Sequence, residues 1–316
     1  MSRLGIINNV QAGRTRARLS RVRELLARCD AAVHDVGDLP SIVNATQDLL
    51  AEEVELIGVN GGDGTAQAVI TELQRHEGPL PELAILPGGT TNLTAHDLNG
   101  RLGIDAAVRA LVNQSGKTTA ERVRVARPLL EVRVAGQPTE FGFFLGAGAI
   151  LAGMRHFRDH VGSRGLRDEL AAGLSLLRGL AGIAGREHAW SDHHTEAQVA
   201  GRSDFAGTQN LVLATTLQRL LLGLKPWWGQ ERAPVHLTAL GHQPKSFLRV
   251  VPSILRGKSH HRATPANGYR SANVNSLVLN AAEGFALDGQ IFTPEPGNAV
   301  SVRATPPHNF VCLGTG

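Results

Sequence analysis

The sequence is poor in cysteine and in aromatic residues, and each scarcity argues against a class of protein. Among 316 residues there are two cysteines and one tyrosine, and aromatic residues make up 4% of the chain. The two cysteines, Cys29 and Cys312, provide no disulfide framework and no metal-ligand spacing, so we expect a reducing compartment. Few aromatics together with 36 glycines favour an α/β protein with tight turns over an aromatic-rich β-barrel.

Long hydrophobic runs are missing as well. No apolar stretch approaches the roughly 20 residues that a membrane-spanning helix needs. The apolar residues near the amino terminus, 4–7, are typical of a short strand and not of a signal peptide. The formal net charge is +4. This excess suits an anionic membrane surface, a nucleic acid or a phosphorylated substrate, and charge alone does not choose among them.

The first 125 or so residues alternate between strand-like and helix-like segments, and the chain is long enough for two domains. Strand-like segments lie at 4–8, 31–36, 54–59 and 83–86, and helix-like segments at 15–29, 41–52, 66–76 and 105–113. This order predicts βαβ units on a parallel, Rossmann-like sheet. Ligands of such sheets bind at the carboxyl ends of the strands.

The pattern changes after Pro128. Two apolar segments at 129–135 and 141–145 flank a turn at 136–138, which predicts paired strands. An arginine-rich helical stretch follows at 154–183. Further strand-like runs lie at 210–215, 235–240, 247–251, 276–279, 285–287 and 299–304. We therefore predict a second domain of antiparallel strands with a helical insertion.

A glycine-rich turn, VNGGDGTAQ, links the third predicted strand to a helix. Gly61, Gly62 and Gly64 are expected to form this turn, because glycine allows positive φ and lets a ligand approach the backbone closely. The free N–H groups at the start of the helix favour an anion such as phosphate. Asp63 would repel that phosphate unless a metal ion intervenes or the carboxylate handles a proton.

Two further polar turns follow predicted strands. In LPGGTTNLTAHDL, residues 86–98, hydroxyl and amide groups come from Thr90, Thr91, Asn92 and Thr94. Near the amino terminus, IINNVQAGRTRARLSR places Asn9 and Gly13 in the turn between the first strand and a basic helix. Two turns suited to phosphate binding, at the ends of successive strands, indicate a phosphate site more specifically than one turn alone.

Together these elements resemble the catalytic superfamily of diacylglycerol kinases, which includes sphingosine, ceramide and bacterial lipid kinases. Its N-P-x-(S/A)-G turn resembles residues 9–13, with valine in place of proline. Its G-G-D-G-T and P-x-G-T-x-N-x-x-A motifs are intact at 61–65 and 87–95. Its D-G-E hairpin resembles the sequence D-G-Q at 288–290. Four elements in this order span nearly the whole chain.

The resemblance implies an architecture and a location. It implies an ATP-binding α/β domain at 1–126, a β-sandwich-like lipid-substrate domain with a helical insertion at 127–293, and a segment at 294–316 that returns to the first domain. ATP and Mg²⁺ are expected in the cleft between the domains. The partners implied are a membrane lipid substrate and an anionic membrane surface, at the cytoplasmic face, with no nucleic acid. The oligomeric state, monomer or homodimer, stays open.

The resemblance also implies roles for single residues. The cofactor-binding set is Asn9, Gly13, Gly61, Gly62, Gly64, Thr65, Gly89, Thr90, Asn92 and Gln290. Phosphoryl transfer to an alcohol needs a group that takes the hydroxyl proton. Two catalytic carboxylates, Asp63 and Asp288, compete for that role. We assign Asp288 as the base and Asp63 to the metal and headgroup side.

Some positions depart from the family pattern. Gln290 replaces the glutamate of D-G-E, and Ala68 stands where many members have glutamate, with Glu72 one turn further along as a substitute. Acceptor recognition is therefore not expected to follow sphingosine kinases in detail. The function we expect is ATP-dependent phosphorylation of a lipid hydroxyl, on diacylglycerol or a ceramide-type lipid. The alternatives are a soluble kinase like NAD kinase and an inactive lipid- or nucleotide-binding member of the family.

Three stretches bear on membrane contact. The arginines at 155–167 and the basic cluster at 256–262 fit either a solvated surface or docking to an anionic membrane. The stretch LQRLLLGLKPWWG at 217–229 fits either a buried helix end with packed tryptophans or an interfacial element. The sequence leaves these alternatives open.

Overall fold

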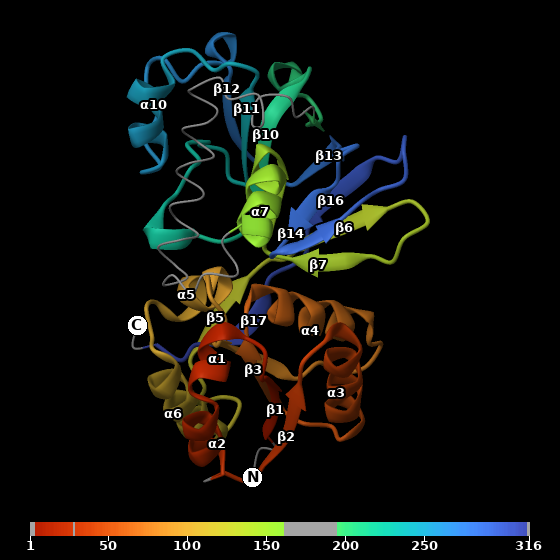
Figure 1. Ribbon diagram of the computed structural model, residues 1–316, viewed down its shortest axis with the longest axis vertical. Coiled ribbons are helices and arrows are strands. Elements are labelled where there is room, and N and C mark those ends of the chain that lie inside the picture. The colour runs from red at the N-terminus through yellow and green to blue at the C-terminus, as the bar shows by residue number, and fades with distance from the viewer. Residues whose placement is uncertain (1–3, 28, 161–194, 315–316) are drawn as a thin grey trace. The chain divides into compact units, whose positions relative to one another are not determined.

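The computed structural model describes residues 4–27, 29–160 and 195–314 (Figure 1). The chain forms two compact units. The first unit comprises Met1–Arg127 and Pro307–Gly316, and the second comprises Pro128–Pro306. Within the described residues, no helix has both the length and the apolar character that crossing a membrane requires.

The first unit contains the predicted α/β sheet. Its six strands lie in the order β2-β1-β3-β4-β17-β5. They are β1 (Leu4–Asn9), β2 (Ala31–Val36), β3 (Leu56–Gly61), β4 (Glu82–Pro87), β5 (Arg124–Arg127) and β17 (His308–Val311). Neighbouring pairs are parallel except β17 with β5. The parallel, Rossmann-like sheet expected from the sequence is confirmed.

Helices cover both faces of this sheet. They are α1 (Gly13–Ala17), α2 (Leu19–Leu26), α3 (Leu39–Ala51), α4 (Asp63–Arg75), α5 (Leu93–Asn99) and α6 (Ile104–Ser115). A Cβ on Gly5 would lie 2.6 Å from a Leu49 methyl of α3, and one on Gly58 would lie 2.4 Å from a Leu111 methyl of α6. Ile6 pairs with Gly58, so Gly5 points to the opposite face. Glycine thus lets one helix approach each face closely.

Two helix boundaries differ from the prediction. The basic helix expected at 15–29 is broken, because Arg18 (φ −130) interrupts it between α1 and α2. The helix expected at 66–76 begins three residues earlier, at Asp63. Gly62 is extended and its carbonyl accepts from the Ala66 N–H at 3.1 Å, so helical bonding starts there. Gly64 therefore lies inside the first turn of α4.

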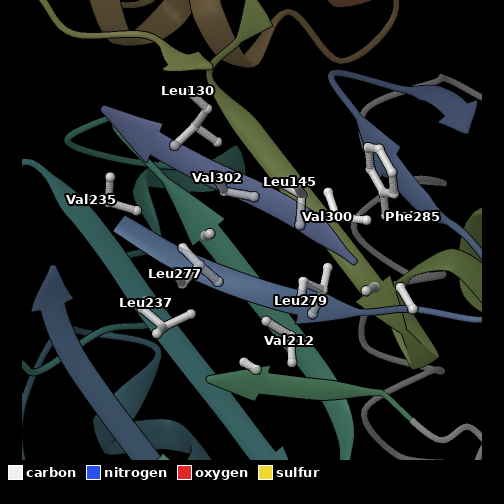
Figure 2. Packing of buried hydrophobic residues seen from close by; sticks show 14 of the residues in the cluster. Leu130, Leu145, Val212, Val235, Leu237, Leu277, Leu279, Phe285, Val300 and Val302 are labelled. Atoms are coloured by element: carbon white, nitrogen blue, oxygen red, sulfur yellow. The ribbon is translucent and has the colours of Figure 1, made fainter. Parts of the chain in front are cut away.

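The second unit is a sandwich of two antiparallel sheets, with orders β12-β11-β10-β8-β14-β15 and β7-β6-β16-β13-β9. The strands are β6 (Leu130–Val134), β7 (Glu140–Gly142), β8 (Phe144–Gly148), β9 (Glu196–Gln198), β10 (Gln209–Thr215), β11 (Val235–Gly241), β12 (Tyr269–Val274), β13 (Ser276–Asn280), β14 (Phe285–Leu287), β15 (Gln290–Phe292) and β16 (Val300–Ala304). Figure 2 shows the core between them, where Leu130 and Val302 lie with Leu145 and Val212. The β-sandwich-like second domain is confirmed.

The outer face of the β8–β10–β11 sheet is also buried. Helices α7 (Ala149–His160) and α10 (Phe247–Ile254) cover it, and their apolar residues form a second cluster with Leu211, Leu213 and Tyr269. Short 3₁₀ turns lie at Ser203–Phe205, Leu221–Gly223 and Pro265–Asn267. The helix expected at 154–183 is described only as far as His160, and its remainder lies outside the described residues.

The strand expected at 247–251 is wrong, because this segment is helix α10. The short apolar run resembles a buried strand in the sequence. The buried residues are Phe247, Val250 and Ile254, whereas Leu248 is exposed. Spacings of three and four residues place one helical face on the second apolar cluster. Packing against that cluster overrides the local strand-like composition.

The single strand expected at 141–145 is divided between two sheets. β7 pairs with β6, whereas β8 pairs with β10 and β14. Phe143 lies at the break. The chain therefore passes from one sheet of the sandwich to the other within one residue.

The carboxyl-terminal return also lies later than residue 294. β16 pairs with β6 and β13, so residues up to Pro306 belong to the second unit. The chain enters the first unit again at Pro307, and β17 then pairs with β4 and β5.

Candidate active site

The two glycine-rich turns of the first unit are in backbone contact. They follow adjacent parallel strands, where Gly61 of β3 pairs with Pro87 of β4. A Cβ on Gly89 would lie 2.3 Å from the Gly62 Cα, a distance that real side chains do not reach. Glycine at position 89 is therefore required for the two turns to meet.

Glycine is needed in these turns because neighbouring atoms leave no room for a Cβ. It is not needed for the positive φ expected from the sequence. None of Gly61, Gly62 and Gly89 has a left-handed backbone. A Cβ on Gly61 would lie 2.6 Å from the Thr65 side chain, and one on Gly88 would lie 2.4 Å from the Thr15 hydroxyl. The left-handed residue of this region is Asn92, with φ 53.

The amino-terminal turn joins the other two. Asn9 Nδ2 donates to Thr65 Oγ1 at 2.8 Å, which ties the end of β1 to the first turns of α4. Just after Gly13, which begins α1, the N–H groups of Arg14 and Thr15 both donate to the Gly88 carbonyl at 3.0 Å. The structure thus brings Asn9, Gly13 and both glycine-rich turns together at the carboxyl end of the sheet.

A buried polar chain runs beneath these turns, and sequence reasoning missed it. Asn8 Nδ2 donates to Asp35 Oδ1 at 2.6 Å, and Asn60 Nδ2 donates to Asn8 Oδ1 at 2.8 Å. The Thr15 hydroxyl lies 3.2 Å from Asn60 Oδ1 and 3.4 Å from the Gly88 carbonyl. Asn8, Thr15 and Asn60 are almost fully buried. We call these four side chains the polar chain.

One signal for the polar chain was present in the sequence. Asn8 and Asn60 each end an otherwise apolar strand, and buried amides need partners. The strands are parallel neighbours, and Asn8 pairs with Asn60 in their register. The polar chain links β2, β1, β3 and α1, and its Thr15 hydroxyl also reaches the Gly88 carbonyl in the turn after β4.

Asp63 joins the starts of two helices. It is the first residue of α4, and its Oδ1 and Oδ2 accept from the N–H groups of Thr94 (2.9 Å) and Leu93 (3.1 Å) in the first turn of α5. Part of the residue is accessible, but its carboxyl lies deep in the protein. Burial raises the pKa of Asp63 above its usual value, and the two amide hydrogen bonds oppose that shift without cancelling it.

Asn92 closes the second glycine-rich turn on itself. Its Oδ1 accepts from the Gly89 N–H and its Nδ2 donates to the Gly89 carbonyl, both at 2.8 Å. The side chain is buried, and its left-handed backbone is a conformation that asparagine tolerates. The contact of Asn92 with a nucleotide stays a prediction, as does that of Thr90 beside it.

Asp288 lies in the second unit, in the hairpin between β14 and β15. Its Oδ2 and Oδ1 accept from the N–H groups of Phe143 (2.8 Å) and Phe144 (2.9 Å), where the chain passes from β7 to β8. The residue is 3% exposed and has a left-handed backbone, with φ 45. Gln290 begins β15 and pairs with Leu287. The carboxylate therefore anchors the hairpin to the point where the chain changes sheets.

Two neighbouring acids already have partners. Glu72, considered above as a substitute for the missing glutamate, accepts from Gln47 Nε2 at 2.7 Å and lies 3.6 Å from Arg75. Asp97 has a fully buried side chain that pairs with Arg127 Nε at 2.9 Å. Ala68 is buried in α4. Asp97 and Glu72 thus have structural contacts within the first unit.

The first unit has features that fit a nucleotide phosphate with Mg²⁺. The start of α4 has no side-chain cap, so its first N–H groups suit an anion. Among the described residues, no group of three or more His, Cys, Asp or Glu side chains is placed to hold a metal ion. One carboxylate completed by phosphates and water is a common Mg²⁺ arrangement, and Asp63 fits that part.

The comparisons with known proteins agree with this geometry. Residues 3–125 match the family of the diacylglycerol kinase catalytic domain. This stretch belongs to that family. The resemblance inferred from the motifs is thereby confirmed, and a kinase is the activity that the family supports.

Solved structures with a similar fold match nearly the whole chain. Two crystal structures of a Bacillus anthracis protein assigned as a diacylglycerol kinase have TM-scores of 0.66 and 0.62. The first is 17% identical and the match covers 96% of this chain and 93% of that one; the second is 16% identical and covers 99% and 97%. At such identity the likeness concerns the fold. No curated protein matches this sequence.

Proposed function

We propose that this protein is an ATP-dependent lipid kinase that transfers the γ-phosphate of ATP to a hydroxyl of a membrane lipid, diacylglycerol or a ceramide-type lipid. The observation that carries the proposal is the contact between Gly62 and Gly89, within a stretch of the diacylglycerol kinase catalytic family. Because the two turns pack so closely, the backbone of both is within reach of one ligand. Peripheral association with an anionic, cytoplasmic membrane surface belongs to this proposal.

In this proposal the chain has three tasks. The N–H groups at the start of α4 bind the phosphates together with the turn at Thr90, where the Gly89 N–H itself is held by Asn92 Oδ1. Asp63 holds Mg²⁺, which neutralises phosphate charge when bound. Asp288 accepts the proton of the lipid hydroxyl. Both carboxylates are held by two backbone N–H groups, so each is fixed in direction before any ligand binds.

Labelled ATP distinguishes the possible activities. The purified chain is incubated with γ-labelled ATP, Mg²⁺ and vesicles that contain diacylglycerol or ceramide, and in parallel with NAD⁺ in buffer. Label in an organic-soluble product supports the proposal and names the acceptor. Label in NADP would instead indicate a soluble dinucleotide kinase, and label in neither product would indicate an inactive binding protein.

The role of Asp288 is tested on the active enzyme. Asp288→Asn keeps one carbonyl oxygen for the backbone N–H groups but cannot take a proton, so kcat should fall by about 10² or more with little change in the KM for ATP. Asp204→Asn, in a half-buried pair with Arg202, is the matched control in the same unit. An unchanged kcat for Asp288→Asn would move the proton-accepting role to Asp63.

A further inference from the structure

Helix α10 presents an exposed leucine beside exposed cations. Leu248 is 77% exposed, and the other exposed large hydrophobic residues of the described chain range from 38% to 53%. One turn further, Pro252 is also exposed, and Val251 and Leu255 are half-buried. A single exposed leucine on a protein surface is common. Leu248 differs because it lies on a helix that is held at both ends and flanked by cations.

The helix is held at both ends, so the exposure of Leu248 is built into the fold. Before the helix, the Tyr269 hydroxyl donates to the Lys245 carbonyl at 2.9 Å, and the Lys245 N–H donates to the Asn267 carbonyl at 3.0 Å. After it, the Lys225 N–H donates to the Leu255 carbonyl at 3.0 Å. The inner face packs on the second apolar cluster. The outer face therefore has a fixed direction.

The cations around this face have no acidic partner in the part of the chain that the structure describes. Five exposed cations lie on α10 or on the segments bonded to its ends: Lys225, Lys245, Arg249, Arg256 and Lys258. None of them forms an ion pair with a residue that the structure describes. Elsewhere arginines are paired, as Arg202 is with Asp204 and Arg303 with Glu131. No described carboxylate neutralises the charge of this face.

The surrounding sequence is acid-free over a long span. No aspartate or glutamate lies between Glu231 and Glu283. The lysines and arginines within that span are Arg232, Lys245, Arg249, Arg256, Lys258, Arg262 and Arg270. The segments before and after α10 therefore carry basic side chains and no acidic ones, and Figure 1 shows the helix at the edge of the second unit beside β12 and β11.

We propose that the outer face of α10, with Leu248 among Lys225, Arg249 and Arg256, docks the second unit onto an anionic lipid surface. In an interfacial helix, apolar side chains enter the membrane interface and cationic side chains stay at the lipid headgroups. Leu248 and its neighbouring cations have this pattern. Trp227 takes no part, because it is buried and stacks on His236 with ring centroids 4.6 Å apart. This docking specifies which surface makes the membrane contact of the proposed function, and its biological role rests on that function.

Sedimentation with vesicles tests the docking on the full chain without any need for kinase activity. Vesicles of phosphatidylglycerol and phosphatidylcholine should carry the wild-type protein into the pellet, whereas vesicles of phosphatidylcholine alone should carry much less. Leu248→Gln should weaken partition about tenfold, since the apolar contact is lost. Arg249→Gln should weaken it about fivefold.

Matched variants separate docking from general surface effects. Leu39→Gln removes a 52% exposed leucine from the first turn of α3, and Arg109→Gln removes an exposed cation of α6. Both should bind vesicles as the wild type does, and the circular dichroism of all four variants should be unchanged. Equal binding by Leu248→Gln and wild type, or no binding of the wild type to anionic vesicles, overturns the proposal. Vesicle binding without lipid phosphorylation keeps the docking and refutes the proposed function.

Discussion

The two units hold their candidate catalytic carboxylates in the same way but in different surroundings. Asp63 and Asp288 each accept hydrogen bonds from the N–H groups of two consecutive residues. Asp63 occupies the start of a regular helix. Asp288 occupies a tight hairpin with a left-handed backbone.

This difference indicates how much the stability of each region depends on its aspartate. Around Asp63, the three turns are also joined by the contact of Gly62 with Gly89, by the bond of Asn9 to Thr65 and by the polar chain. Around Asp288, the carboxylate serves the N–H groups of Phe143 and Phe144, at the point where the chain leaves one sheet for another. We therefore expect the second unit to depend more on its aspartate.

The largest expected effect comes from Asp288→Ala. Two N–H groups lose their acceptor, at about 1–3 kcal/mol each when buried, and alanine tolerates φ 45 less well than aspartate. We expect the free energy of unfolding to fall by about 3 kcal/mol or more. Asp63→Ala should cost about 1–2 kcal/mol, as for a lost helix cap.

Urea unfolding measures both losses, and the probes separate the units. All three tryptophans lie between residues 128 and 306, so their fluorescence follows the second unit. The wild-type protein and Asp204→Asn are the references. Equal losses for Asp288→Ala and Asp63→Ala would contradict the comparison of the two regions.

The next largest effect should come from Gly89→Ala in the first unit. The new Cβ would lie 2.3 Å from the Gly62 Cα, so one of the two turns must move, at a cost of about 2 kcal/mol. Gly116→Ala is the control, because its nearest neighbour would lie 3.7 Å away and its φ is −72. Circular dichroism during urea unfolding reports the difference. If both variants unfold at the same urea concentration, the contact of the turns contributes nothing.

A smaller effect is expected from Thr15→Val in the polar chain. The buried Asn60 side chain and Gly88 carbonyl lose their hydroxyl donor, which should cost about 1–2 kcal/mol of unfolding free energy. The control is Thr46→Val, because the Thr46 hydroxyl donates only to the Ile42 carbonyl of its own helix. A cost for Thr46→Val as large as that for Thr15→Val would show that the polar chain has no special weight.

The smallest effect concerns Tyr269, the only tyrosine, beneath α10. Burial raises its pKa to about 12 from the usual 10. A raised pKa means that the folded state favours the neutral phenol, so this contribution to stability is complete below pH 10 and is lost as the pH rises through 12. Tyrosinate absorbance should titrate near pH 12 in the folded protein and near pH 10 in urea. Coincident titrations would contradict the buried position.

The sequence predicted the first unit better than the second. Hydrophobic periodicity predicted β1 to β4 and the helices between and after them except α5, and the glycine motifs marked the turns that the structure brings together. Elements α5, β5 and β17 of the first unit were not predicted. In the second unit, the division of 141–145 and the helix at α10 were missed. A short apolar run fits a strand and a buried helix equally well, and only its packing partners decide between them.

The candidate site divides in a similar way. Its positions could be recognised from motifs, because glycines and an aspartate at a strand end indicate a ligand-binding turn from the local sequence alone. The bonds of those residues could not, since Asp63 bonds a residue 31 positions away and Asp288 one 145 positions away. The polar chain needed the register of β1 with β3, which no local pattern supplies.

The turns, the buried strands and the backbone suited to phosphate could be recognised from local sequence, because these features depend on neighbours within a few residues. Long-range packing sets which N–H groups hold the two carboxylates, where only glycine fits and which leucine faces outward. Those properties arise from segments far apart in the chain, and close packing and hydrogen bonding act between whatever the fold brings together.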